Sequence, residues 1–373
     1  MKKNLNIAIL GGGLAGLTAA IHLKKAGYTI QVFEKERCPK HKVCGEYLSN
    51  EILPYWQKLE VNPCDWGAVS ISDLYFTTSK GKNIKAALPL GGFGISRYTL
   101  DSKMTEVAKE VGCQFIFKTV ESVDFDKYFT IKTQDNTLYK ADLVIGTYGK
   151  RSNLDISLSR KFIQKKSPWL GVKMHYNAEI DKRTVQLHNF EGGYCGISQV
   201  EDNRVNVCYL THLDAFKKWG NLENFQYQVL RKNPYLEAFF SDANPLFEKP
   251  LSISQVSFQQ KQLVENHVLM CGDSAGLIHP LCGNGMAMAV VGAKILSECI
   301  IEYEQAKQNR NQLENNYSKK WNAEFTSRLR TGRVLQGILQ NKTITNYSLK
   351  ALQSFPFMMD KLIESTHGKP VSL

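Results

Sequence analysis

Three glycines near the N-terminus have the spacing of a phosphate-binding turn. Gly11, Gly13 and Gly16 form a GxGxxG pattern directly after the apolar run of residues 5–10, and Glu34 follows about 20 residues later. Glycines at these positions permit a tight turn, a close approach of backbone to a pyrophosphate, and close packing of the following helix. The start of that helix offers unpaired N–H groups to phosphates, and the acid can accept hydrogen bonds from a ribose. The pattern therefore predicts a dinucleotide-binding βαβ unit.

The hydrophobic periodicity around this turn predicts two kinds of sheet. Strands are expected at 5–10 and 29–33 with a helix at 18–26 between them, and residues 141–146 and 268–271 are typical of buried parallel strands. From about residue 168 to 257 the pattern changes to antiparallel strands with polar turns, expected at 172–176, 185–190, 194–200 and 204–210, with a helix at 221–240. The second block indicates a separate sheet inserted into the first domain.

Composition indicates a globular protein with a large core. The chain has 373 residues, of which 43% are hydrophobic and 22% charged. No apolar run in the sequence reaches the roughly 18–20 residues that a membrane span needs. The nine cysteines are scattered without a CxxC pair or zinc-like spacing, so no metal site is expected. Reduced thiols are predicted, and with them a cytoplasmic location.

The net charge is +12, from 47 Lys and Arg against 35 Asp and Glu. Such a surplus is compatible with an acidic partner, an anionic membrane surface or a nucleic acid, and equally with solubility and attraction for a phosphorylated cofactor. The basic residues are dispersed and no nucleic-acid-binding motif is present. We therefore expect no nucleic acid as a partner.

Four separated segments carry a resemblance to a known superfamily. They are GGGLAG with Glu34, the segment from Ser96-Arg97 to Asp101, ADLVIGTYGKRS (141–152) and GDSAGLIHPLCGNGM (272–286). In their order and spacing the chain resembles the FAD-dependent oxidoreductases that join group A flavin monooxygenases with geranylgeranyl reductases, which share the fold of p-hydroxybenzoate hydroxylase. The match spans most of the chain.

The resemblance implies an α/β fold with a Rossmann-type FAD-binding domain, an inserted antiparallel β-sheet substrate domain and a helical C-terminal segment. We expect residues 1–75, 95–165 and 265–310 to form the discontinuous FAD-binding domain. Residues 76–94 and 166–264 would form the substrate domain, and residues 311–373 the C-terminal segment. The substrate would lie at the domain interface, between the inserted sheet and the flavin.

The resemblance also implies FAD as the bound dinucleotide. Asp273 matches the acid that accepts a hydrogen bond from a ribityl hydroxyl, residues 280–286 match the loop whose N–H groups face the flavin ring, and Arg97 matches an arginine over the FAD. A helix N-cap, for Asp273, and an ordinary surface position, for Arg97, are the structural alternatives. The full set expected to bind cofactor is Gly11, Gly13, Leu14, Ala15, Gly16, Glu34, Lys35, Cys44, Gly45, Arg97, Gly149, Gly272, Asp273, Pro280, Gly283, Asn284, Gly285 and Met286.

The expected catalytic residues are Cys44 and Glu46. Geranylgeranyl reductases have a Cys-Gly pair near the flavin, and Cys44-Gly45 matches it. A thiol there could donate a proton to a substrate carbon after hydride transfer, or it could simply pack against the ring. Glu46 and His41 are acid–base candidates with weaker support, and His279 precedes the flavin loop.

Two departures from the superfamily pattern limit the prediction. Tyr148-Gly149 stands where Asp-Gly is frequent, which puts NAD(P)H in doubt as the direct electron donor. The aromatic segment of the reductases is only partly present at residues 194–198 and lacks its tryptophan. Flavin halogenases fit least well, because the sequence has no WxWxIP segment.

Two reactions therefore remain open for a hydrophobic small-molecule substrate. The first is hydroxylation of an aromatic or polyketide-like compound, which the 272–286 region slightly favours. The second is reduction of a carbon–carbon double bond, which Cys44-Gly45 favours. A flavoprotein that modifies a protein partner is a further alternative, as is peripheral membrane association through residues 336–359, although packing of that stretch onto the FAD domain explains its composition as well.

Overall fold

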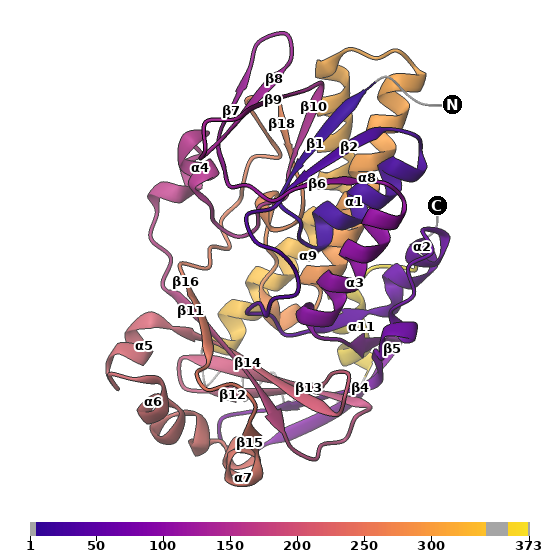
Figure 1. Cartoon of the computed structure of the whole chain (residues 1–373). Coiled ribbons are helices and arrows are strands. Elements are labelled where there is room, and N and C mark those ends of the chain that lie inside the picture. The colour runs from indigo at the N-terminus through magenta and orange to yellow at the C-terminus, as the bar shows by residue number, and fades with distance from the viewer. Residues whose placement is uncertain (1–4, 341–356, 372–373) are drawn as a thin grey trace.

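The computed structural model describes residues 5–340 and 357–371 (Figure 1). In this part of the chain, six strands form a sheet in the order β17-β18-β10-β1-β2-β6, in the upper half of the view. All neighbours are parallel except β17, which is antiparallel to β18. The strands are β1 (Asn6–Leu10), β2 (Thr29–Phe33), β6 (Gln114–Ile116), β10 (Leu143–Gly146), β17 (Val264–Glu265) and β18 (Val268–Met270).

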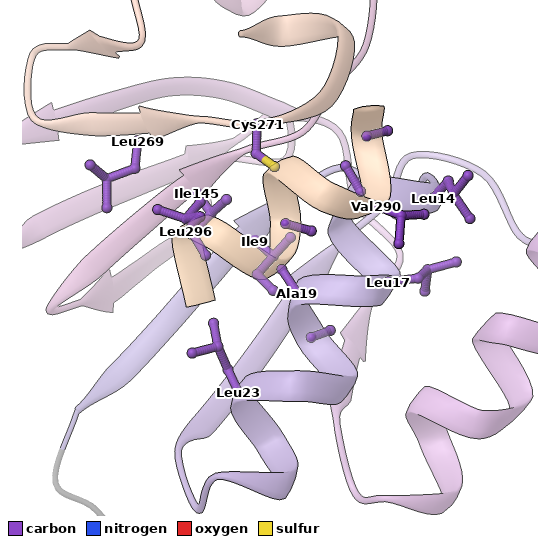
Figure 2. Packing of buried hydrophobic residues seen from close by; sticks show 14 of the residues in the cluster. Ile9, Leu14, Leu17, Ala19, Leu23, Ile145, Leu269, Cys271, Val290 and Leu296 are labelled. Atoms are coloured by element: carbon purple, nitrogen blue, oxygen red, sulfur yellow. The ribbon is translucent and has the colours of Figure 1, made fainter. Parts of the chain in front are cut away.

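Helices α1 (Leu14–Lys25) and α8 (Gly285–Gln305) pack together against the parallel sheet. Ile9 and Ile145 are neighbours in register, as are Ile145 and Leu269, so three adjacent strands present one apolar row to these helices (Figure 2). Helix α1 begins four residues earlier than the sequence predicted, because it starts directly after the glycine turn and is buried over its first ten residues. Its close packing fixes the turn against the strand ends.

Nine described strands form a second sheet, in the lower half of Figure 1. Eight follow the order β15-β11-β14-β13-β12-β4-β5-β3, and β16 pairs with β11; β12 and β4 are parallel, and the other pairs are antiparallel. Two strands, β3 and β4, begin before residue 76, so the sheet also takes in an N-terminal part of the chain. The strands are β3 (Tyr47–Ser49), β4 (Val69–Thr77), β5 (Asn83–Gly94), β11 (Trp169–Asn177), β12 (Thr184–Phe190), β13 (Gly193–Gln199), β14 (Arg204–His212), β15 (Asn244–Pro245) and β16 (Leu251–Ser254).

Helices α5 (Leu213–Lys217), α6 (Leu222–Gln228) and α7 (Pro234–Asp242) lie beside this sheet, and α6 and α7 bury apolar side chains against its outer face. The single helix predicted at 221–240 is wrong. Asn233 caps a new helix at Pro234, and proline cannot donate the N–H that a continuous helix would need. A small sheet of β7 (Val120–Phe125), β8 (Phe129–Thr133) and β9 (Leu138–Ala141) completes the strands.

Five further described helices lie around the sheets, and one of them, α4 (Asn153–Ser157), packs on β7 of the small sheet. Helix α3 begins at the junction of the two large sheets, α9 packs on α8, and α11 packs on β5. Within the described residues, no helix combines the length and apolar character needed to cross a bilayer. The stretch 336–359, considered above for membrane contact, lies largely outside the described residues. These helices are α2 (Leu53–Lys58), α3 (Arg97–Glu110), α4 (Asn153–Ser157), α9 (Arg310–Gln340) and α11 (Phe357–Thr366).

Candidate functional site

A cavity of about 960 Å³ lies between the carboxyl ends of the parallel strands and the inner face of the antiparallel sheet. The carboxyl ends of such strands are the usual place for a ligand in an open α/β sheet. Of the residues expected to bind cofactor or act in catalysis, all but Gly16 and Asn284 line it. The lining members of that set are Gly11, Gly13, Leu14, Ala15, Glu34, Lys35, Cys44, Gly45, Glu46, Arg97, Gly149, Gly272, Asp273, Pro280, Gly283, Gly285 and Met286.

The glycine turn has the shape of a phosphate cradle. Gly11 has φ +117°, and a Cβ there would lie 2.5 Å from the Thr147 carbonyl oxygen. A Cβ on Gly16 would lie 2.1 Å from the Gly11 carbonyl oxygen, so Gly16 acts through packing behind the cradle. Gly13 is the N-cap of α1, and no described side chain caps that end. The open helix start fits a pyrophosphate, which accepts hydrogen bonds from free N–H groups.

Glu34 braces this turn from the end of β2. Its Oε2 accepts a hydrogen bond from the Gly12 N–H at 2.9 Å, and its Oε1 accepts one from Lys40 Nζ at 3.2 Å. The carboxylate thus has a structural task in addition to facing the cavity. Lys35, next to it, also lines the cavity but is largely exposed. Lys40 was not identified from the sequence.

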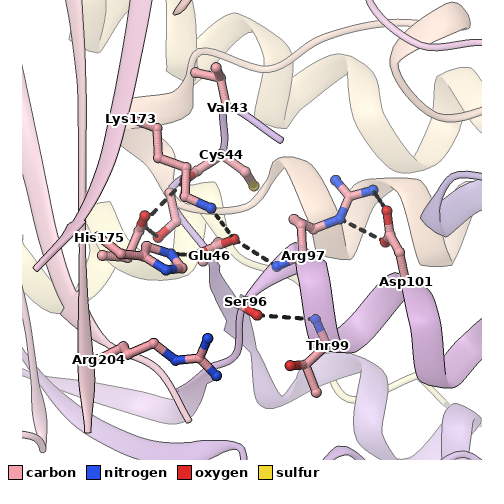
Figure 3. A network of polar contacts seen from close by, with 12 residues as sticks. Val43, Cys44, Glu46, Ser96, Arg97, Thr99, Asp101, Lys173, His175 and Arg204 are labelled. Carbon is pink, nitrogen blue, oxygen red and sulfur yellow. Dashed lines mark hydrogen bonds and ion pairs between the residues drawn. The ribbon is translucent and has the colours of Figure 1, made fainter. Parts of the chain in front are cut away.

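Arg97 places a permanent positive charge beside the cradle. Its Nε and one terminal nitrogen each donate to Asp101 at 2.8 Å, and that nitrogen lies 4.0 Å from the position that a Gly13 Cβ would occupy (Figure 3). Lys42 also donates to Asp101, at 2.7 Å. Burial alone would raise the pKa of Asp101, but Arg97 and Lys42 lower it below its ordinary value. The carboxylate therefore stays charged and orients Arg97 toward the turn.

Asp273 follows β18 and faces the cavity beside Gly272, which has φ +63°. The backbone oxygen of Asp273 accepts a hydrogen bond from Lys261 Nζ at 2.7 Å. This bond does not use the Asp273 carboxylate. Burial lowers the pKa of Lys261 to about 8, against the opposing charge of Asp273. On the neighbouring strand end, the Gly149 N–H donates to Ser274 Oγ at 3.0 Å and holds the two loops together.

The loop before α8 continues the cavity wall. Gly283 has φ +63°, and a Cβ there would touch the Tyr47 ring. Asn284 is fully buried but does not line the cavity: its Nδ2 donates to the Thr366 carbonyl oxygen at 2.8 Å. The Asn284 side chain therefore ties the loop to the C-terminal helix, while backbone groups on both sides of it face the cavity.

Cys44 and Gly45 lie where the two sheets meet. The Cys44 thiol is half-buried, lines the cavity and lies 3.5 Å from the Met286 sulfur at the start of α8. The Gly45 carbonyl accepts a hydrogen bond from Asn206 Nδ2 at 2.9 Å, which fixes the loop on β14. A thiol in this position can reach a molecule in the cavity.

Glu46 is fully buried in a left-handed conformation, with φ +54°. Its Oε1 accepts hydrogen bonds from the Arg97 N–H at 2.6 Å and from Lys173 Nζ, and its Oε2 lies 2.7 Å from His175 Nε2 (Figure 3). Burial alone would raise the pKa of Glu46, but Lys173 and the hydrogen bond from His175 outweigh it and lower that pKa. Glu46 is thus an ionised group that joins β11 to the start of α3.

The two histidines named from the sequence are neutral near pH 7. Burial, with the charge of Lys173, lowers the pKa of His41 to about 4; its ring lines the cavity and stacks on Tyr98. Burial also lowers the pKa of His279 to about 4. His279 packs among aromatic rings, including Trp169, and is not part of the cavity wall.

Sequence reasoning missed Lys173 and His175. Both stand on β11, where they alternate with Val172 and Met174 and are fully buried. Charged residues at alternate positions of a nearly continuous apolar strand were a readable signal, because buried charges need partners. A helical C-terminal segment was expected at residues 311–373, but not that the apolar side chains of its helix α11 would line the cavity.

Comparisons with known proteins agree with this architecture. Residues 9–68 match the family model of an NAD(P)-binding Rossmann-like domain. The chain is 24% identical to Conditioned medium factor receptor 1 of Dictyostelium discoideum, over 86% of this chain and 68% of that one. It is 23% identical to a kynurenine 3-monooxygenase of Flavobacterium johnsoniae (81% and 74%) and 20% identical to digeranylgeranylglycerophospholipid reductase 1 of Methanosphaera stadtmanae (84% and 80%).

Solved structures share the fold. The flavin-dependent brominase Bmp2 has a TM-score of 0.80 at 15% identity, covering 98% of this chain and 93% of that one. PqsL, a probable FAD-dependent monooxygenase from Pseudomonas aeruginosa, has a TM-score of 0.73 at 13% identity, covering 93% and 100%. At these identities the likeness is one of fold alone. The comparisons confirm the predicted resemblance and fold class, together with the enzyme class and the FAD cofactor that the resemblance implied.

Proposed function

We propose that this chain is an FAD-dependent monooxygenase acting on a hydrophobic small molecule. The observation that carries the proposal is one continuous cavity, which joins a phosphate cradle to an apolar sheet face. The cradle at Gly11 and Gly13, the Arg97 guanidinium and the Asp273 side chain are the groups that would hold FAD. A cofactor and an apolar substrate could then share a single cavity.

The loop before α8 would face the reactive part of the cofactor. FAD, when bound, supplies two-electron chemistry, either for activation of dioxygen or for delivery of a hydride. The N–H groups of Gly285 and Met286 open α8, which no described side chain caps, and they would stabilise negative charge beside them. The buried apolar side chains of Leu277 and Ile278 would limit the access of water to this point.

Reduction of a carbon–carbon double bond is a second candidate, and the position of Cys44 favours it. Such a reduction adds a hydride to one carbon and a proton to the other. The Cys44 thiol lines the cavity and could supply that proton, after which water would reprotonate the sulfur. Glu46 is unsuited to the same task, since its carboxylate is ionised and already accepts from Arg97, Lys173 and His175. We therefore assign Glu46 to positioning of the 44–46 loop and of α3.

The test compares the two reactions on the purified protein. The protein, loaded with FAD, is reduced without oxygen and divided between two probes, para-hexylphenol with isotopically labelled dioxygen and farnesol without oxygen. Mass spectrometry then reads the products. A product that has gained one labelled oxygen atom supports the monooxygenase, and a gain of two hydrogens by farnesol supports the reductase.

Two controls make the outcome decisive. Cys44→Ala should abolish the gain of hydrogen and leave the gain of oxygen intact, whereas Cys64→Ala, at an exposed cysteine outside the cavity, should change neither. A protein that binds no FAD, or that binds it and transforms neither probe, would contradict the proposed function.

A further inference from the structure

The inner face of the antiparallel sheet forms an apolar floor to the cavity. We define this floor by eight of the residues that line the cavity on four adjacent strands: Leu74 and Phe76 of β4, Val185 and Leu187 of β12, Tyr194 and Gly196 of β13, and Cys208 and Leu210 of β14. They occur at alternate positions, as side chains on one face of a sheet must. None of them is charged.

The strand register makes this floor continuous. Val185 lies beside Leu74, Leu187 lies beside Phe76 and also beside Gly196, and Gly196 lies beside Cys208. From β14 to β4 the floor crosses three strand spacings, which is about 14 Å. It therefore extends well beyond the Cys44 loop, toward β5 and the C-terminal helix.

Helix α11 closes the space above the β4 and β5 end of the floor. Met359 and Ile363 are buried against Ile71 and Leu88, while Leu362 is half-buried and lines the cavity. Met358, one residue earlier than Met359, also lines the cavity and is 42% exposed, so the cavity reaches the surface there. At this end of the cavity, apolar side chains of the floor lie on one side and apolar side chains of α11 on the other.

Buried polar contacts hold α11 in place. Besides the Asn284 bond to Thr366, the fully buried Glu51 accepts a hydrogen bond from the Gly368 N–H and pairs with Arg328 at 3.2 Å. The Glu51 carbonyl oxygen also accepts from the Val371 N–H at 2.8 Å. Helix α11 and the residues that follow it are therefore bonded to buried residues of the core and to the loop before α8.

From these contacts we propose that the space between the floor and α11 binds the hydrocarbon tail of an amphiphilic substrate, and that Leu362 and Val185 determine the tail length accepted. The substrate class is thus a molecule with a compact reactive head, placed beside Cys44 and Met286, and an extended apolar tail directed toward α11. A charged group in that space would lose hydration without gaining a partner. The proposal rests on the proposed function for the position of the head.

The test is a calorimetric titration of the purified protein with para-ethylphenol, para-butylphenol and para-hexylphenol. Each buried methylene should tighten binding about fourfold, so that the hexyl compound binds roughly 200-fold more tightly than the ethyl compound when its tail is fully enclosed. Leu362→Trp fills the space and should reduce this ratio below about tenfold. Leu138→Trp, at a residue 63% exposed on β9, is the matched control and should leave the ratio unchanged.

Val185→Trp fills the same space from the opposite wall and decides the question if Leu362→Trp does not fold. Equal affinity for the ethyl and hexyl compounds in the wild-type protein would overturn the proposal, and so would a full chain-length dependence in a folded tryptophan variant. Calorimetry needs no turnover, so a chain-length dependence without product refutes the reaction and leaves the tail site standing. Turnover with no chain-length dependence refutes the tail site alone.

Discussion

Replacement of Glu46 by glutamine tests whether the buried cluster holds β11 and the start of α3 together. Glu46 accepts from the Arg97 N–H, Lys173 Nζ and His175 Nε2, and both Glu46 and Lys173 are fully buried. A glutamine has one oxygen to accept with, and its amide nitrogen would face a donor. Lys173 would keep its charge without a counter-charge.

The expected loss of stability is large because both members of the pair are out of water. Removal of one partner from a buried ion pair costs about 3–5 kcal/mol, a substantial share of the 5–15 kcal/mol typical of a whole domain. Replacement of both partners by uncharged groups costs much less. Glu46→Gln with Lys173→Met should therefore recover at least half of the stability lost in Glu46→Gln alone.

The coupling free energy between Glu46 and Lys173 is measured by urea unfolding at pH 7 of the wild type, both single variants and the double variant. Glu106→Gln is the control, because its partner Lys103 is also exposed and an exposed pair contributes at most about 1 kcal/mol. The reasoning fails if Glu46→Gln unfolds within about 1 kcal/mol of the wild type, or if the two single losses simply add in the double variant.

The same cluster predicts a dependence of stability on pH. The folded protein lowers the pKa of Glu46 below its ordinary 4.5. The carboxylate therefore contributes its full stabilisation above pH 4.5, and that contribution is lost as the pH falls through the lowered folded value. Unfolding of Glu46→Gln, measured over the same acid range, should lack this part of the pH dependence.

Three further predictions concern the cavity. Gly16→Ala should destabilise the fold by about 1–3 kcal/mol, because its Cβ would overlap the Gly11 carbonyl oxygen, whereas Gly13→Ala should unfold like the wild type and lose FAD affinity; thermal unfolding and FAD titration separate the two effects. Arg97→Met should weaken FAD binding about tenfold to a hundredfold, as loss of a charged hydrogen-bond donor does, and unchanged affinity in a fluorescence titration would remove Arg97 from the cofactor site. Cys44→Ser should retain its FAD content, and loss of flavin from that variant would mean that the thiol serves packing instead of chemistry.

The βαβ unit could be predicted because its information is local. Gly11, Gly13 and Gly16 follow a strand directly, so their spacing can be read from six residues of sequence, although the backbone that Gly11 approaches belongs to the distant residue Thr147. Asp273 and the loop after it were expected at the cofactor because of the resemblance, and they line the cavity. Within this unit the start of α1 was misplaced, because a glycine-rich helix start has weak propensity of its own and is fixed by packing against the sheet.

Other features depend on contacts across long separations in the chain. Glu46 meets Lys173 and His175, which are 127 and 129 residues away, and the sequence around Glu46 does not reveal that these residues would occupy its carboxylate. The sequence therefore suggested Glu46 as an acid–base group, whereas in the fold its ionised carboxylate connects β11 to α3. Asn284 likewise belonged to a loop expected at the flavin, but its side chain reaches Thr366 on α11.

The sequence by itself determined the cofactor cradle, the buried parallel strands and the existence of an alternating sheet, since each depends on residue types at short spacing. The tertiary structure decided which faces of the two sheets oppose each other, which carboxylates carry buried pairs, and that α11 closes one end of the cavity. The physical reason is that hydrophobic periodicity, with a period of two residues in a strand and 3.6 in a helix, shows which side of an element is apolar. It does not show which other element will cover that side. That choice comes from packing summed over the whole chain.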